Sequence, residues 1–379
     1  MNMYNVYTLF DVTPEKGVGA YVYDHEGTEY LDFYGGHAVI SVGHSHPSYV
    51  AAIQDQIAKI GFYSNSVINP LQQALADRLA SVSGMRGYDL FLINSGAEAN
   101  DNALKLASFY KGRKKILALH NGFHGRTSAA INVTHTGQKH QAPINHGVEV
   151  TYCDHDDIQT ILEEINTSQY AGIIIEAIQG VGGLDMISDG YLPMIKKACD
   201  ATDTILIMDE VQCGYGRSGH FFAFQSADIR PDIISMAKGM GNGFPIGGIL
   251  INADKMPAVK SQLGTTYGGN HLACRAASAV LDIIQEEKLI ENARQIGGYL
   301  KESLSQLPHV VRIKGRGLMM GLELDQEVGD IRKKLVYDYK LFTGSSSDKR
   351  VLRLLPPLNI TTDHADIFLD KITAVLHQI

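Results

Sequence analysis

Two side chains with complementary chemistry stand at the ends of apolar stretches of this sequence. Asp209 closes the run Ile-Leu-Ile-Met-Asp at residues 205–209, and Lys238 follows the largely apolar residues 233–237 and precedes a glycine cluster. Because an unpaired ammonium is costly to bury, a lysine in this position needs a chemical reason. A lysine amine can bond to an aldehyde, and a carboxylate can keep a ring nitrogen protonated so that the ring accepts electrons. The pair indicates a pyridoxal phosphate site and carbanion chemistry on an amine.

A possible phosphate site lies upstream, where an apolar strand at residues 90–94 runs into Ser95, Gly96 and Ala97 and a helix-forming segment follows. This arrangement places free backbone N–H groups and the positive end of a helix where a phosphate can bind. Ser95 with Glu98 three residues later is also a capping box, which starts a helix without any ligand. Both interpretations can hold, because a cap and an anion site occupy the same helix end.

Several ordered motifs place the chain in a known family. It resembles the class III, ornithine-type aminotransferases of the fold-type I pyridoxal phosphate enzymes, and within them it is most similar to acetylornithine aminotransferases. The resemblance rests on motifs at residues 30–39, 43–47, 94–100, 123–127, 175–180, 209–214, 237–238, 265–270 and 353–357. They cover nearly the whole chain in the family's order.

The resemblance implies a cofactor site in which Asp209 and Lys238 are the catalytic residues. Asp209 is expected to pair with the ring nitrogen, Gln212 to reach the phenolic oxygen, and Phe123 to lie against the ring face. Thr266 matches a residue that completes the phosphate site of the neighbouring subunit, so a homodimer with shared active sites is expected. The full cofactor-binding set is Ser95, Gly96, Ala97, Phe123, His124, Asp209, Gln212, Lys238 and Thr266.

Two arginines suit a dicarboxylate acceptor, which the resemblance implies to be 2-oxoglutarate. Arg353 matches the family's α-carboxylate arginine and Arg126 the one for the distal carboxylate, and the planar guanidinium binds a carboxylate through two parallel hydrogen bonds. Taken alone, Arg353 would be interpreted as a salt bridge at a strand edge. The expected substrate-binding set is Arg126, Arg353, Asn65, Ser64, Glu176 and Thr265. The segment 61–70, which holds two of them, could also be an ordinary surface loop.

Two departures from the family bear on the amine donor. Val181 stands where relatives have a second glutamate that pairs with the arginine aligned to Arg353, and His271 replaces a proline. We expect a transfer of the δ-amine of N-acetyl- or N-succinyl-L-ornithine to 2-oxoglutarate, giving the semialdehyde and glutamate in arginine biosynthesis. Ornithine, lysine and γ-aminobutyrate aminotransferases are the alternatives. A pyridoxal phosphate isomerase or lyase, and a cofactor-binding regulator without turnover, are disfavoured by the filled catalytic positions and the two arginines.

The composition fits a metabolic enzyme. The 379 residues carry a net charge of −8, which favours neither nucleic acid nor an anionic membrane as a partner, and no apolar run approaches the roughly 18 residues of a membrane span. The N-terminus lacks a secretory pattern, and the four cysteines have no Cys-x-x-Cys spacing, so a cytoplasmic location with reduced thiols is expected. His44 and His46 have no nearby acid or thiol cluster, and no metal is assigned.

Short apolar runs alternate with helical stretches, which indicates an α/β fold with a mainly parallel sheet covered on both faces. The expected strands are residues 90–94, 115–119, 148–152, 172–176, 204–209, 232–236 and 247–252. A smaller α+β domain follows, with strands at 310–314, 318–324 and 351–355, and Gly297 and Gly298 weaken a helix at 289–304. We expect residues 1–45 and 288–379 to form the small domain and residues 46–287 the large cofactor-binding domain.

Overall fold

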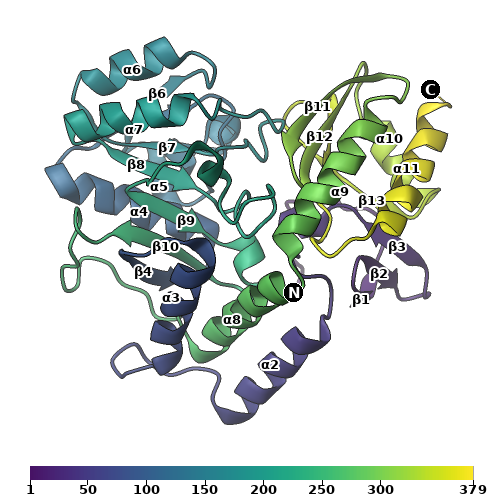
Figure 1. Ribbon diagram of the computed structural model, residues 1–379, viewed down its shortest axis with the longest axis horizontal. Coiled ribbons are helices and arrows are strands. Elements are labelled where there is room, and N and C mark those ends of the chain that lie inside the picture. Colours follow the sequence, from purple (N-terminus) through teal and green to yellow (C-terminus); the bar gives the residue numbers. More distant parts are fainter. Residues whose placement is uncertain (379) are drawn as a thin grey trace.

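The larger lobe is built on a seven-stranded sheet in the order β4-β10-β9-β8-β7-β5-β6 (Figure 1). The structure is a computed structural model that describes residues 1–378. Only β10 runs against its neighbours, so the sheet is mainly parallel, as expected. In sheet order the strands are β4 (Tyr88–Ile93), β10 (Gly247–Asn252), β9 (Ile233–Met236), β8 (Ile205–Asp209), β7 (Tyr170–Ile175), β5 (Lys115–Leu119) and β6 (Glu149–Cys153).

The strands are continuously apolar because both faces of the sheet are covered. In β8, Leu206 and Met208 belong to one apolar core while Ile205 and Ile207 belong to the other. The second core also contains the buried face of α4 (Gly96–Lys111), and the first contains buried residues of α6 (Ile158–Asn166) and α7 (Tyr191–Thr202). Burial on two sides explains why no polar alternation marks these strands.

The smaller lobe contains two four-stranded sheets. One is antiparallel, in the order β11-β12-β15-β14; the other joins β1, β2 and β3 from the N-terminus to β13 by parallel pairing. The N-terminal segment thus lies with the C-terminal part, although the domain limits at residues 45 and 287 stay a prediction. The strands are β1 (Pro14–Val18), β2 (Tyr21–Asp24), β3 (Glu29–Asp32), β11 (Val310–Arg316), β12 (Met319–Leu324), β13 (Leu341–Phe342), β14 (Gly344–Ser345) and β15 (Val351–Leu354).

The remaining helices are divided between the two lobes, with α3 and α5 in the large lobe (Figure 1). With the small lobe lie α9 (Leu289–Leu304), α10 (Gly329–Tyr337) and α11 (Thr362–Leu376). The others are α1 (Gly35–Ala38), α2 (Pro47–Lys59), α3 (Pro70–Ser83), α5 (Ser128–Asn132), α8 (His271–Glu286) and the 3-10 turns η1 (His135–His140), η2 (Pro143–Asn145), η3 (Ala223–Ala227) and η4 (Lys238–Met240). No helix within residues 1–378 is both long and apolar enough to cross a membrane.

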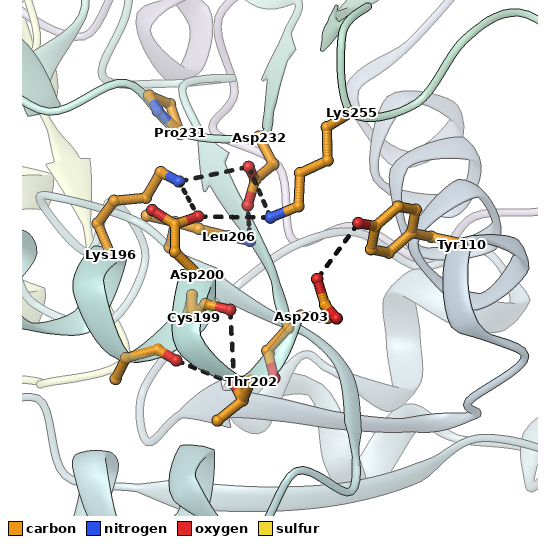
Figure 2. A network of polar contacts seen from close by, with 12 residues as sticks. Tyr110, Lys196, Cys199, Asp200, Thr202, Asp203, Leu206, Pro231, Asp232 and Lys255 are labelled. Atoms are coloured by element: carbon orange, nitrogen blue, oxygen red, sulfur yellow. Dashed lines mark hydrogen bonds and ion pairs between the residues drawn. The ribbon is translucent and has the colours of Figure 1, made fainter.

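A buried ion cluster holds the amino-terminal ends of β8 and β9 together, as Figure 2 shows. Asp232 is fully buried, accepts a hydrogen bond from the Leu206 amide at 2.9 Å and lies 3.1 Å from Lys255 Nζ and 3.5 Å from Lys196 Nζ. Asp200, which is half exposed, pairs with both lysines. Asp209 lies at the opposite end of the same strand pair. The ion cluster around Asp232 therefore stabilises one end of β8 and β9, and Asp209 stands at the other end.

Candidate active site

A cavity of about 400 Å³ lies at the carboxyl ends of the parallel strands, where α/β sheets bind ligands. Most of the residues that the sequence singled out line it: Ser95, Gly96, Ala97, Phe123, His124, Arg126, Glu176, Asp209, Gln212 and Lys238. Val39, Val181, Phe244 and Ile246 add apolar walls. Chain segments more than a hundred residues apart therefore meet in one hollow.

Asp209 ends β8 and is the centre of a buried polar network. Its Oδ2 accepts hydrogen bonds from His124 Nδ1 at 2.7 Å and Asn100 Nδ2 at 2.8 Å, and its Oδ1 accepts one from the Val211 amide at 3.0 Å. Burial alone would lower the pKa of His124, but the hydrogen bond to Asp209 and the charges of Asp209 and Glu176 together raise it. An imidazole whose pKa is raised favours the positive charge, which suits the carboxylate that it contacts.

The sequence did not assign Asn100 a role, although the residue closes the motif at 94–100. It lies on the buried face of α4 among Ala99, Ala103 and Ala107. Besides Asp209, its amide donates to the backbone oxygen of His124 at 2.7 Å. A single amide on a helix face of small apolar residues was the signal that could have identified it, because buried polar groups need a specific partner.

Lys238 follows β9 in a tight turn. Its φ is 44°, in the left-handed region that lysine rarely adopts, and the turn is closed by a hydrogen bond from the Gly241 amide to its carbonyl at 3.0 Å. The side chain faces the cavity, and burial lowers the pKa of its amine, although Asp209 and Glu176 partly oppose this. A strained backbone and a less basic amine are both features of functional sites.

The start of α4 forms the narrow end of the cavity. Ser95 caps the helix by accepting a hydrogen bond from the Glu98 amide at 3.2 Å, which is one half of the predicted capping box. The other half differs from the prediction, because the Glu98 carboxylate accepts from the Asn94 amide at 2.7 Å and not from the amide of Ser95. Small residues are required here, because a Cβ on Gly96 would lie 2.5 Å from Val211 Cγ1. The first turn of a sixteen-residue helix thus faces the cavity with its backbone exposed to a ligand.

Glu176 organises the loop that carries Gly180 and Val181. One carboxylate oxygen accepts from the Phe123 amide at 2.8 Å and the other from the Gly180 amide at 2.9 Å. Burial raises the pKa of Glu176 to about 7. Since both oxygens bond to backbone, this residue positions the Phe123 backbone and the loop, and its contact with a substrate stays a prediction.

Arg353 on β15 reaches this loop from the small lobe. It is 3% exposed, and its Nη1 donates to the Gly180 carbonyl at 2.8 Å while its Nε donates to the Ser345 carbonyl at 2.5 Å. The predicted alternative, a strand-edge salt bridge, does not occur: the arginine–carboxylate pairs within residues 1–378 are made by Arg78, Arg312, Arg316 and Arg350. Two carbonyls orient the guanidinium, which does not itself line the cavity.

The whole chain agrees with one family model. Residues 3–376 match the model of "Aminotransferase class-III". This chain belongs to that family. It is 39% identical to an acetylornithine aminotransferase of Aquifex aeolicus over 99% of this chain and 98% of that protein, and 39% identical to one of Methanosarcina mazei over 94% and 89%.

Solved structures of aminotransferases have the same fold. The ornithine aminotransferase of Toxoplasma gondii ME49 superposes with a TM-score of 0.92 at 29% identity, covering 99% of this chain and 92% of that one. An acetylornithine aminotransferase of Elizabethkingia anophelis gives a TM-score of 0.87 at 28% identity, with 99% and 96% covered. The fold-type I assignment made from the sequence is confirmed.

Class III aminotransferases depend on pyridoxal phosphate, and the residues of this cavity fit that cofactor. A helix start, a buried carboxylate and a half-buried lysine line one cavity. Gln212 adds a buried Oε1 that has no hydrogen-bond partner within residues 1–378, while its Nε2 donates to the His37 carbonyl at 3.2 Å. A polar group left unpaired at the cavity wall is where a ligand group would be expected.

Five predicted site residues do not line the main cavity: Arg353, Ser64, Asn65, Thr265 and Thr266. Asn65 and Thr265 line a separate cavity of about 280 Å³, where Asn65 Nδ2 donates to the carbonyls of Thr265 at 3.3 Å and Gly268 at 3.1 Å. Ser64 and Thr266 are exposed and do not line the main cavity. Their roles stay predictions, and for Thr266 the resemblance places that role in a neighbouring subunit.

Proposed function

We propose that this aminotransferase moves the δ-amine of N-acetyl- or N-succinyl-L-ornithine to 2-oxoglutarate, producing the semialdehyde and glutamate in arginine biosynthesis. The proposal rests chiefly on one observation: Lys238 and the buried Asp209 line one cavity, and Arg353, which has no acidic partner in residues 1–378, donates to the carbonyl of Gly180 next to the cavity residue Val181. The relatives at 36–39% identity that carry the name acetylornithine aminotransferase support the choice of donor.

When bound, pyridoxal phosphate supplies an aldehyde and an electron-accepting ring. Ser95, Gly96 and Ala97 would hold its phosphate at the start of α4, and Phe123 would cover the ring. The Asp209 carboxylate, oriented by its hydrogen bond with His124, would hold the proton on the ring nitrogen. These residues bind and orient; none of them needs to move.

Lys238 Nζ would remove the proton from the amine-bearing carbon of the substrate. It would then deliver the proton to the former aldehyde carbon of the cofactor, which completes the transfer of the amine. A proton carrier works best when its pKa lies near the working pH, and burial moves the pKa of Lys238 in that direction. The apolar walls formed by Val39, Val211 and Phe244 would exclude water around this step.

The substrate carboxylates would bind at opposite ends of the cavity. Arg353 would take the α-carboxylate of donor and acceptor alike, and Arg126 at the exposed mouth would take the distal carboxylate of 2-oxoglutarate. Val181 replaces a carboxylate with an apolar surface beside Gly180, so no internal acid competes for Arg353 and an acyl group has a surface to rest on.

We also propose a cytoplasmic homodimer with a small domain formed by residues 1–45 and 288–379. Large apolar side chains are exposed near the second cavity, among them Tyr63, Ile68 and Tyr267. A second copy would bury this surface and would bring Thr266 to its neighbour's phosphate site.

Purified enzyme assayed with a panel of amines tests the choice of donor. N-acetylornithine, N-succinylornithine, ornithine, lysine and γ-aminobutyrate would be compared at matched concentration with 2-oxoglutarate, and glutamate and the carbonyl product would both be measured. We expect the highest kcat/KM for an N-acylornithine and one glutamate per carbonyl formed. A higher kcat/KM for free ornithine, which the similarity to ornithine aminotransferase structures makes the second candidate, would overturn the donor assignment. Carbonyl without glutamate would indicate a lyase.

A further inference from the structure

The ring of Tyr34 lies near two arginines, one of which, Arg353, also donates to the carbonyl of Gly180. The guanidinium carbons of Arg353 and Arg332 are each 5.8 Å from the centre of its ring. The guanidinium carbon of Arg332 also lies 4.8 Å from the centre of the Phe10 ring. Rings and guanidinium groups therefore alternate from the N-terminal segment to Arg353, at distances where a cation is attracted to an aromatic face.

The members of this stack are fixed by the surrounding backbone and side chains. The Tyr34 hydroxyl lies 2.5 Å from His37 Nδ1, and His37 stands in a left-handed turn, residues 35–38, whose φ values are 54°, 54°, 68° and 64°. Gly344 leaves room for the ring, since a Cβ there would lie 2.5 Å from Tyr34 Cε2. Arg332 Nε donates to the Thr343 carbonyl at 2.8 Å. Strained backbone that is held this firmly points to function.

The charge of the stack is not balanced within residues 1–378. Neither Arg332 nor Arg353 forms an ion pair there, and burial lowers the pKa of both. Two partly desolvated cations near one ring repel each other, and carbonyl partners do not cancel their charge. A bound anion beside Arg353 would relieve this cost.

We propose that Arg332 is a positioning residue for substrate carboxylates: it holds Tyr34 against Arg353 and adds a second positive charge behind it, without touching the substrate. The inference rests on the proposed function, in which Arg353 receives the α-carboxylate. It predicts that removing the charge of Arg332 weakens the binding of carboxylates while the chemical step is kept.

The test measures binding of glutarate, an unreactive dicarboxylate, to the cofactor-loaded enzyme by calorimetry at low and high salt. Arg332→Met should weaken binding by about four- to fifteen-fold at low salt, as a unit charge on the order of 10 Å away would at an effective dielectric constant of about 20–40. Its salt dependence should also fall. Arg332→Lys keeps the charge and should stay within about three-fold of the wild type. KM for 2-oxoglutarate should rise in parallel, with kcat little changed.

Arg230→Met is the matched control. Arg230 also lies over a tyrosine, with its guanidinium 5.0 Å from the ring centre of Tyr88, and donates to the Arg86 carbonyl, but it is outside the site. Glutarate binding should be unchanged in this variant. Should Arg332→Met fail to fold, Arg332→Gln carries the same expectation.

Wild-type affinity for glutarate in a folded, neutral Arg332 variant would overturn the inference. Arg353→Met separates this from the proposed function, because that variant should lose glutarate binding in either case. If Arg353→Met also binds glutarate normally, the assignment of Arg353 to the carboxylate is wrong and the proposed function fails with it. Equal loss in Arg332→Lys and Arg332→Met would contradict a role based on charge.

Discussion

Replacing Asp209 with asparagine removes the charge of the buried network and keeps its shape. The carboxylate is 3% exposed and accepts hydrogen bonds from His124, Asn100 and the Val211 amide. An asparagine amide must point one N–H group at one of these donors, which costs about 1–3 kcal/mol of stability. It would also remove the cause of the raised pKa of His124, so burial would leave the imidazole neutral.

The effect on catalysis should be far larger than the effect on folding. Two opposite charges about 4 Å apart attract by about 4 kcal/mol at an effective dielectric constant of about 20, and each 1.36 kcal/mol in a barrier is about ten-fold in rate. We therefore expect Asp209→Asn to slow proton removal on the order of a thousand-fold. The assay mixes cofactor-loaded enzyme with amine alone and follows the single-turnover change in cofactor absorbance.

Asp232→Asn is the control, because Asp232 is a buried aspartate on the neighbouring strand at the opposite end of the sheet. Leaving Lys196 and Lys255 without their buried partner should lower the melting temperature, yet the single-turnover rate constant of the folded enzyme should stay within about two-fold of wild type. The reasoning fails if Asp209→Asn, with cofactor bound, reacts within ten-fold of the wild type or no slower than Asp232→Asn.

Three further predictions concern the arginines, the lysine and the loop. Arg353→Ala should lower kcat/KM for 2-oxoglutarate by roughly 30- to 4,000-fold, because removing one partner of a buried ion pair costs about 2–5 kcal/mol. This variant should impair both half-reactions, whereas Arg126→Ala should mainly impair the half-reaction with 2-oxoglutarate. Equal, small losses in separate half-reaction assays would refute this division. Lys238→Met should raise the melting temperature of the cofactor-free protein, because burial lowers the lysine pKa below its ordinary 10.5 and the folded state then disfavours the charge. The gain should be larger at pH 7 than at pH 10, where the unfolded lysine also loses its proton, and no gain at pH 7 would contradict it. Val181→Glu should place an acid near Arg353 and raise KM for 2-oxoglutarate, and an unchanged KM in steady-state kinetics would count against that proximity.

Local sequence predicted the strands of the large sheet well, because each is a continuous apolar run. The expected strands at 115–119 and 247–252 coincide with β5 and β10, and that at 204–209 differs from β8 by one residue. Neither the reversed direction of β10 nor the parallel pairing of β3 with β13 could be read locally, since both depend on contacts between distant segments.

The site shows the same limit. Motifs predicted most of the residues that line the cavity, including His124, but not the hydrogen bonds to Asp209 from Asn100 and His124, which come from 109 and 85 residues away. A glycine was also misread: Gly297 was expected only to weaken a helix. Its missing side chain lets α9 approach the backbone at Gly317, where a Cβ would lie 2.2 Å from the carbonyl oxygen. The sequence shows that a glycine is present, but the backbone segment that packs against it is known only from the fold.

The central claim is that Lys238 carries pyridoxal phosphate, and borohydride reduction tests it most directly. Reduction fixes the cofactor to the amine that holds it, and peptide mass mapping then locates the added mass. We predict that the mass lies on the peptide containing Lys238, and that Lys238→Ala abolishes turnover while retaining some cofactor through the start of α4 and Asp209. Cofactor mass on another lysine, or a fully active Lys238→Ala enzyme, would contradict the account.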